Sequence, residues 1–202
     1  MKLLVATRSA GKQREMVRAL EGAGHEVVFP DDAGIQESPI EDALEQGETF
    51  EANARSKAEY FARRSGLPTL ADDSGLEVLS LGGAPGVRSR RWAGATGSPA
   101  EVDAANNQEL RRRLLGADED RRRARYRCVL VLLRTPGAFP EVFEGSCTGT
   151  IVSEPRGTGG FGYDPWFLSD ELGKTFGEAT ADEKAAVSHR GRALAKLIQA
   201  LG

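Results

Sequence analysis

The sequence contains little cysteine and no long apolar run. Its two cysteines, Cys128 and Cys147, each lie in a strand-like segment. Small secreted scaffolds use more cysteine than this, so we expect two reduced, buried thiols and a cytoplasmic location. No stretch of about 18 apolar residues and no signal-peptide pattern occurs, so we expect no association with a membrane.

The sequence also lacks a strong excess of charge, because its net charge is −3. An arginine-rich segment at 111–125 is interrupted by Asp118, Glu119 and Asp120. We interpret this segment as a solvated helix end and loop, and we expect no binding to nucleic acid. C-x-x-C and H-E-x-x-H patterns are missing as well, which removes the usual sequence signals for zinc.

The hydrophobic pattern that is present predicts an α/β fold with a mixed sheet. A chain of 202 residues suits one domain or two small lobes that share a core, and we expect a single domain over residues 1–202. The pattern predicts a strand at 2–7, a helix at 11–24, a parallel strand at 25–29, an acidic loop at 30–48, a helix at 49–66, a helix from a Ser98–Glu101 capping box to Leu115, antiparallel strands at 124–134 and 139–152, and a last helix carrying Leu194, Leu197, Ile198 and Leu201.

The stretch "ADDSGLEV" (71–78) is the strongest single site signal. It places Asp72 and Asp73 side by side where a short apolar strand is expected to end. Like charges at close range raise each other's pKa unless a positive charge offsets them. A hard divalent cation such as Mg²⁺ is one such charge, and it takes one or two carboxylates together with water and substrate phosphates. The alternative is that one aspartate only caps the turn at Gly75.

Three further segments carry polar groups that suit a nucleotide. "TRSAGK" (7–12) lies between a strand and a helix N-terminus and can bind an anion, although Ala6 and Gln13 exclude a P-loop and a plain turn with a surface lysine is the alternative.

"GTGGFG" (157–162) matches a dinucleotide pattern, but no helix follows it. Phe161 in this loop can stack on a flat ligand or pack into the core. "EKAAVSHRGRAL" (183–194) places Lys184, Ser188, His189 and Arg190 just before the last helix, where they can contact phosphate or base carbonyls or remain solvated.

Taken together, these motifs resemble the inosine triphosphate pyrophosphatase family, the dITP/XTP pyrophosphatases. The resemblance runs from residue 2 to about 200 and is carried by "TRSAGK", "EQGETF", "ADDSGLEV", "GGAPGVRSRRWAG", "PRGTGGFGYDPWF", "GKTF" and "EKAAVSHR". It implies an elongated mixed β-sheet flanked by helices, in two lobes with an active-site cleft between them. It also implies a cytosolic homodimer that uses Mg²⁺ to hydrolyse ITP, dITP and XTP to the monophosphate and pyrophosphate.

The resemblance assigns roles to individual residues. Asp73 becomes the catalytic base and a metal ligand, with Glu45 as a second ligand and Asp72 beside it. The substrate-binding residues that it implies are Thr7, Arg8, Ser9, Ala10, Gly11, Lys12, Ser74, Phe161, Gly162, Tyr163, Asp164, Lys184, His189 and Arg190. Three positions depart from the family pattern: Ser9 replaces asparagine, Ala52 replaces glutamate and Trp92 replaces tyrosine.

We therefore expect Asp73 to activate a water that attacks the α-phosphorus, while Lys12 stabilises the pyrophosphate leaving group. Lys184, His189 and Arg190 offer donors to a 6-keto purine, which favours hypoxanthine and xanthine over adenine. Two alternatives stay open: a pyrophosphatase of modified pyrimidine nucleotides, and a nucleotide sensor that does not hydrolyse its ligand. A haloacid-type phosphatase is disfavoured because "DDS" lacks the D-x-D nucleophile pattern.

Overall fold

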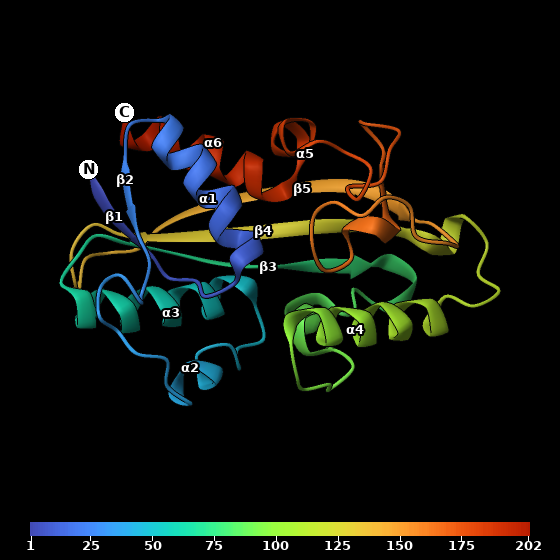
Figure 1. The fold of residues 1–202 in the computed structure, drawn as a ribbon, viewed down its shortest axis with the longest axis horizontal. Coiled ribbons are helices and arrows are strands. Elements are labelled where there is room, and N and C mark those ends of the chain that lie inside the picture. The colour runs from blue at the N-terminus through green and yellow to red at the C-terminus, as the bar shows by residue number, and fades with distance from the viewer. The chain divides into compact units, whose positions relative to one another are not determined.

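The computed structural model describes all 202 residues and has an α/β fold (Figure 1). Its sheet has six strands in the order β2-β1-β3-β4-β5-β6. The strands are β1 (Lys2–Val5), β2 (Glu26–Val28), β3 (Thr69–Val78), β4 (Arg123–Leu133), β5 (Glu141–Ile151) and β6 (Phe167–Ser169). The helices are α1 (Ala10–Gly22), α2 (Ile40–Ala43), α3 (Phe50–Ser65), α4 (Pro99–Arg113), α5 (Ala181–Val187) and α6 (His189–Leu201).

The sheet is mixed, as predicted. β1 pairs in parallel with β2 and with β3, whereas β5 pairs antiparallel with β6. None of the helices combines the length and the apolar character that crossing a bilayer requires. The predicted α/β class, with helices flanking a mixed sheet, is confirmed.

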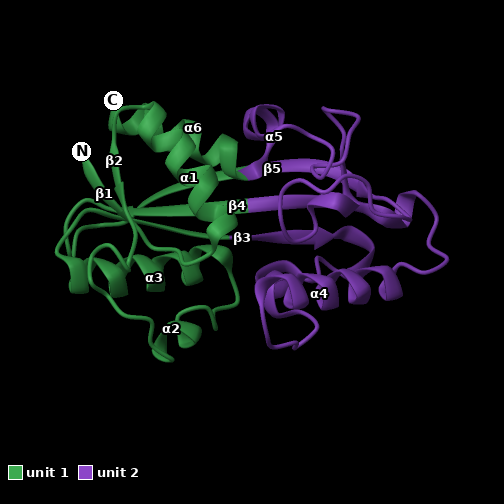
Figure 2. Ribbon diagram, viewed as in Figure 1, with its two compact units in different colours: residues 1–73, 128–145, 190–202 green, residues 74–127, 146–189 purple.

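The chain divides into two compact units, each assembled from separate stretches of sequence (Figure 2). Unit 1 contains residues 1–73, 128–145 and 190–202, and unit 2 contains residues 74–127 and 146–189. Each unit contains a cluster of buried apolar side chains. The single domain over 1–202 stays a prediction.

Unit 1 is built on the predicted β1-α1-β2 segment. Met16 and Leu20 of α1 are buried in a cluster that also contains Leu3, Val5, Leu70, Cys128, Leu130, Leu132, Ala193, Leu194 and Leu197. Helix α3 begins after Thr49, whose side chain accepts a hydrogen bond from the backbone of Ala52, and Gly66 ends the helix with φ +69°. Both ends of α3 follow ordinary capping chemistry, which is why the sequence predicts them.

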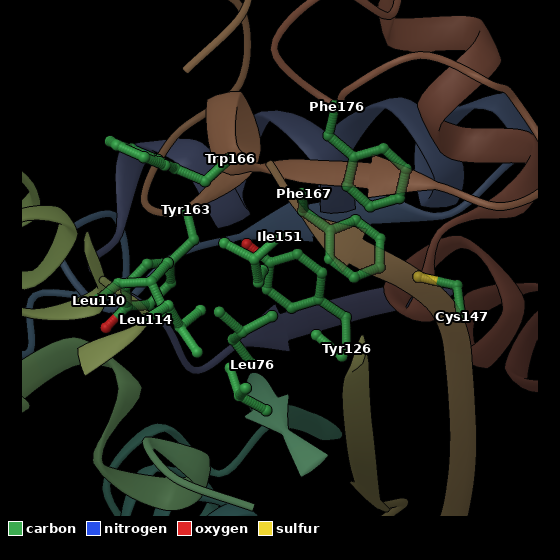
Figure 3. Packing of buried hydrophobic residues seen from close by; sticks show 12 residues of the cluster. Leu76, Leu110, Leu114, Tyr126, Cys147, Ile151, Tyr163, Trp166, Phe167 and Phe176 are labelled. Atoms are coloured by element: carbon green, nitrogen blue, oxygen red, sulfur yellow. The ribbon is translucent and has the colours of Figure 1, made fainter. Parts of the chain in front are cut away.

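Unit 2 has an aromatic core (Figure 3). Its buried residues are Leu76, Val78, Leu110, Leu114, Ala124, Tyr126, Cys147, Ile151, Tyr163, Trp166, Phe167 and Phe176. The ring centroids of Tyr126 and Phe167 lie 4.7 Å apart, and those of Phe167 and Phe176 lie 5.1 Å apart. The predicted capping box of Ser98 and Glu101 opens α4. Both cysteines are free and buried, as expected.

One predicted boundary is wrong, and two short helices were not predicted. β3 does not end at the aspartate pair but continues to Val78, because Leu76 and Val78 are fully buried and extend the strand's apolar face. The segment before the last helix forms a helix of its own, α5, because Thr180 and Glu183 make a capping box that the pattern analysis missed. The short helix α2 also lies within the predicted loop at 30–48.

Candidate active site

The two aspartates of β3 lie next to each other in the chain but contact different partners. Successive side chains of a strand point to opposite faces. Asp72 accordingly lies 3.1 Å from the Nζ of Lys12 and 3.4 Å from the Nη2 of Arg190. Asp73 lies 3.9 Å from the Nζ of Lys57 and accepts a hydrogen bond of 2.8 Å from Asn53. All of these contacts lie within unit 1.

Asp72 is a buried anion that holds two cations. Its side chain is 1% exposed. Burial opposes its ionisation, but the charges of Lys12, Arg190 and Lys57 outweigh burial and hold the pKa of Asp72 below its usual range. The guanidinium of Arg190 is also bonded to Glu15. Asp72 therefore stays ionised and orients Lys12 and Arg190.

Asp73 has the opposite electrostatic setting. Burial raises its pKa, and the nearby charge of Glu45 adds to the increase, although Lys57 and Lys12 lower it. The amide of Asn53 fixes one carboxylate oxygen, since its own oxygen accepts a 2.7 Å hydrogen bond from the backbone of Gly47 and its nitrogen must then face Asp73. An oriented carboxylate with a raised pKa suits a general base.

Lys57 joins the two predicted metal ligands. Its Nζ donates to the Oε1 of Glu45 at 2.6 Å and to the backbone oxygen of Asp72, and it faces Asp73. The charges of Glu45, Asp73 and Asp72 raise its pKa against the opposing effect of burial. Neither Lys57 nor Asn53 was predicted as a site residue from the sequence. The available signal was their i, i+4 spacing on the face of α3 that also carries Ala54, Ala58 and Phe61.

The carboxylates of unit 1 suit a magnesium ion better than a closed metal site. No group of three or more His, Cys, Asp or Glu side chains is arranged to hold a metal. Glu45 and Asp73 nevertheless converge on one ammonium group, that of Lys57. Magnesium commonly takes only one or two protein carboxylates and completes its shell with water and phosphate. The donors present therefore fit Mg²⁺ accompanied by a phosphorylated substrate.

The turn at 7–12 brings Lys12, and not Arg8, to the aspartates. The guanidinium of Arg8 donates to Glu41 at 2.7 Å, to Asp31 and to the backbone oxygen of Ile35. Ser9 is the N-cap residue of α1, but its side chain makes no capping hydrogen bond. The side chain of Ser9 therefore does not occupy the backbone N–H groups in the first turn of α1. Such N–H groups at a helix N-terminus can bind an anion.

Unit 2 carries the second group of predicted site residues. The Oδ2 of Asp164 accepts hydrogen bonds from the Nζ of Lys184 at 2.6 Å and from the backbone of Phe161 at 2.8 Å. The Nζ of Lys184 also lies 4.8 Å from the ring centroid of Phe161. Asp164 and Lys184 are both buried. A flat aromatic face and an ammonium group are therefore fixed beside each other.

Neighbouring residues hold this group in place. The hydroxyl of Tyr163 donates to the backbone oxygen of Ser89 at 2.9 Å. His189 stacks on Tyr126, with ring centroids 4.6 Å apart. The backbone of Gly162 is bonded to Asp103 and Asn107 of α4, which the sequence analysis missed. Ser74, the first residue of unit 2, is half-buried.

Three residues that were grouped on the basis of the sequence have different contacts in the structure. Lys184, His189 and Arg190 were expected to read the base together. The structure places Arg190 with Glu15 and Asp72 in unit 1, while Lys184 contacts Asp164 in unit 2. Arg190 therefore belongs with the carboxylates and Lys12, because Asp72 and Glu15 occupy its guanidinium.

Comparisons with known proteins identify the family of this chain. The family model described as the Ham1 family matches residues 3–200. A dITP/XTP pyrophosphatase of Syntrophobacter fumaroxidans is 51% identical over 195 residues, covering 96% of this chain and 79% of that protein. A dITP/XTP pyrophosphatase of Shigella flexneri is 46% identical over 201 residues, covering 99% of this chain and 98% of that protein.

The fold is shared with solved structures too. The HAM1 protein from Coxiella burnetii matches with a TM-score of 0.85 and 36% identity, covering 100% of this chain and 98% of that one. A nucleoside-triphosphatase / dITP/XTP pyrophosphatase from Mycobacterium abscessus matches with a TM-score of 0.73 and 43% identity, covering 98% of each chain. The resemblance drawn from the sequence motifs is confirmed, and this chain belongs to the Ham1 family.

Proposed function

We propose that this protein hydrolyses the non-canonical purine nucleoside triphosphates ITP, dITP and XTP to the monophosphate and pyrophosphate. The observation that carries the proposal is the convergence of Glu45 and the oriented Asp73 on one buried ammonium, that of Lys57. A carboxylate with a raised pKa favours turnover over passive sensing. The names of the relatives, dITP/XTP pyrophosphatase, supply the substrate class.

In the proposed reaction, unit 1 handles the phosphates. A water attacks the α-phosphorus, the bond from that phosphorus to the bridging oxygen breaks, and pyrophosphate leaves. Asp73 accepts the proton of the water, and the ammonium of Lys12, held by Asp72, faces the charge that develops on the leaving group. Glu45 and Asp73 would hold Mg²⁺, which when bound supplies positive charge to the phosphate oxygens.

Unit 2 reads the base in this proposal. Phe161 offers a ring for stacking, and the ammonium of Lys184, which is paired with Asp164, can only donate hydrogen bonds. The 6-keto oxygen of hypoxanthine or xanthine accepts such a bond, whereas the 6-amino group of adenine would set donor against donor. Sites that rely on such bonds can reject the wrong analogue by up to about 10⁴- to 10⁵-fold.

The wider setting belongs to the same proposal. Two free, buried cysteines suit a reducing compartment, so we place the enzyme in the cytoplasm, where it would cleanse the nucleotide pool. The homodimer rests on the family resemblance. Sedimentation of the purified protein at micromolar concentration would detect a monomer and so exclude it.

The reaction can be tested with a panel of nucleoside triphosphates and Mg²⁺, with pyrophosphate and orthophosphate measured separately. We expect pyrophosphate from ITP, dITP and XTP, and little from ATP. Inosine diphosphate with orthophosphate as first products would mean that a different bond breaks, and a complete lack of products would favour the sensor.

The base assignment can be tested with Lys184→Met. This change should lower kcat/KM for ITP more than kcat/KM for ATP, so the ratio of the two kcat/KM values should fall. Lys174→Met is the matched control, since that lysine is exposed and bonded to Glu183. An equal loss for both nucleotides would remove Lys184 from base reading.

A further inference from the structure

The loop that carries Phe161 is held from outside by two side chains of α4. The Oδ2 of Asp103 accepts a 2.9 Å hydrogen bond from the backbone N–H of Gly162. The Nδ2 of Asn107 donates a 3.1 Å hydrogen bond to the backbone oxygen of the same glycine. Asp103 and Asn107 are four residues apart, so they lie on one face of the helix. Together they hold the two peptide groups that follow Phe161.

This loop needs outside support because its backbone is intrinsically flexible. Gly157, Gly160 and Gly162 all have positive φ, at +76°, +74° and +63°. Glycine loses more conformational freedom on folding than any other residue, so three such positions make a fixed loop conformation costly. At Gly162 an added Cβ would meet nothing within 4 Å. The space beside its Cα is thus open, while Asp103 and Asn107 hydrogen-bond its backbone N–H and its carbonyl oxygen.

Asp103 is the stronger of the two contacts. Its side chain is 27% exposed, and its other oxygen lies 3.3 Å from Nη1 of Arg90. A hydrogen bond that involves an ionised group is roughly twice as strong as a neutral one. The Asp103 bond is of this kind, while that of Asn107 is neutral. Removing Asp103 should thus release the loop more than removing Asn107.

We propose that Asp103 and Asn107 are positioning residues that hold the Phe161 loop in its base-stacking conformation without touching the nucleotide. The inference rests on the proposed function, because that proposal assigns the ring of Phe161 to stacking on the base. The inner contacts of the loop, from Asp164 to Lys184 and to the backbone of Phe161, set the ring beside its ammonium partner. Asp103 and Asn107 hold the next two peptide groups, which determine whether that arrangement is populated before substrate arrives.

The expected effect is on binding and not on the chemical step. When only a fraction of the protein has a competent loop, apparent affinity falls by that fraction. A hydrogen bond to a charged group can change an equilibrium constant by about 10- to 100-fold. Asp103→Ala should accordingly raise KM for ITP by about tenfold and change kcat by less than about twofold. Asp103→Asn keeps an acceptor oxygen, so its KM should rise less than that of Asp103→Ala. Asn107→Ala should also raise KM less than Asp103→Ala.

Three measurements separate positioning from general damage to the fold. Hydrogen exchange should speed up at the amide of Gly162 in Asp103→Ala while the helix stays protected. Competitive inhibition by pyrophosphate, which has no base, should keep its Ki. Gln108→Ala, an exposed change on the same helix, should leave KM and the melting temperature unaltered.

A double-mutant cycle with Phe161→Ala decides the matter. If the proposal holds, Phe161→Ala raises KM, and Asp103→Ala has little further effect in that background. A tenfold rise in both backgrounds, or a matching rise in the Ki of pyrophosphate, overturns the positioning role. If Phe161→Ala leaves KM unchanged, the base assignment of the proposed function fails and this inference fails with it. If Phe161→Ala raises KM but Asp103→Ala does not, only the role of Asp103 is refuted.

Discussion

Replacement of Lys57 by methionine tests whether a buried cation holds the carboxylates of unit 1 together. Methionine keeps the length and apolar stem of lysine but removes the ammonium that contacts Glu45, Asp73 and the backbone oxygen of Asp72. The carboxylate of Asp73 would then remain buried without its closest cation. We expect Lys57→Met to be folded but much less stable.

The size of the effect follows from distance and burial. Lys57 and Asp73 lie 3.9 Å apart, and their side chains are 9% and 8% exposed. Two unit charges about 4 Å apart at an effective dielectric constant of about 20 interact by about 4 kcal/mol. This agrees with the roughly 3–5 kcal/mol lost when one partner of a buried ion pair is removed. The contact of Lys57 with Glu45 is shorter, but the side chain of Glu45 is 30% exposed and its interaction is screened.

Urea unfolding and thermal melting in EDTA would measure this loss. A change of 1 kcal/mol shifts Tm by about 2–4 °C in a domain of this size, so we expect a drop of roughly 10 °C. Lys196→Met, an exposed lysine of the same unit that bonds a backbone oxygen, should shift Tm by only about 1–2 °C. Lys57→Met with Asp73→Asn should regain most of the stability. A Lys57→Met protein as stable as the wild type would refute the reasoning.

Four further predictions concern single groups. Asp73→Asn should lower kcat by a factor of about 10² to 10⁴ or more. Mg²⁺ at about 100 times its Kd should raise the Tm of the wild type by roughly 5–10 °C and that of Asp73→Asn by much less. Because its pKa is depressed, Asp72 stabilises the fold above the ordinary aspartate pKa; urea unfolding of Asp72→Asn should show a deficit at pH 5–7 that shrinks as the pH falls below about 4. Burial raises the pKa of Cys128 to about 12, so a thiol reagent at pH 8 should modify no cysteine before unfolding and two afterwards. In Gly157→Ala the new Cβ would lie 2.1 Å from the oxygen of Gly177, so denaturation should show a large loss in the free energy of unfolding. In Gly116→Ala the space for the Cβ is open, so the loss should be only about 1–2 kcal/mol, from backbone strain.

The features that the sequence predicted depend on local chemistry. The first strand, helix and returning strand follow from apolar periodicity, and the helix ends at Gly66 and Ser98 are set by residues within a few positions. The end of β3 was missed because Asp72 and Asp73 interrupt an apolar alternation that resumes at Leu76. Adjacent charged residues favour the prediction of a loop, because the sequence does not show which cations will neutralise them in the folded protein.

The unpredicted part of the candidate site depends on contacts distant in sequence. Arg190 is bonded to Glu15, 175 residues away in the chain, and to Asp72, 118 residues away. Because Arg190 directly follows His189 in the motif, the sequence favours the prediction of a common role for both residues. No spacing rule in the sequence indicates that the two side chains join different clusters, because folding decides which distant carboxylate each cation meets.

The two aspartates show how a strand can give adjacent residues different chemistry. Because their side chains leave opposite faces of β3, Asp72 meets Lys12 and Arg190, while Asp73 meets the neutral amide of Asn53 and the more distant ammonium of Lys57. The first setting depresses the pKa of Asp72 and the second leaves burial to raise that of Asp73. A base must be ready to accept a proton, which a carboxylate bonded to two cations is not. In the proposed reaction, this pairing would let Asp72 hold cations in place for the substrate phosphates while Asp73 keeps the basicity that hydrolysis requires.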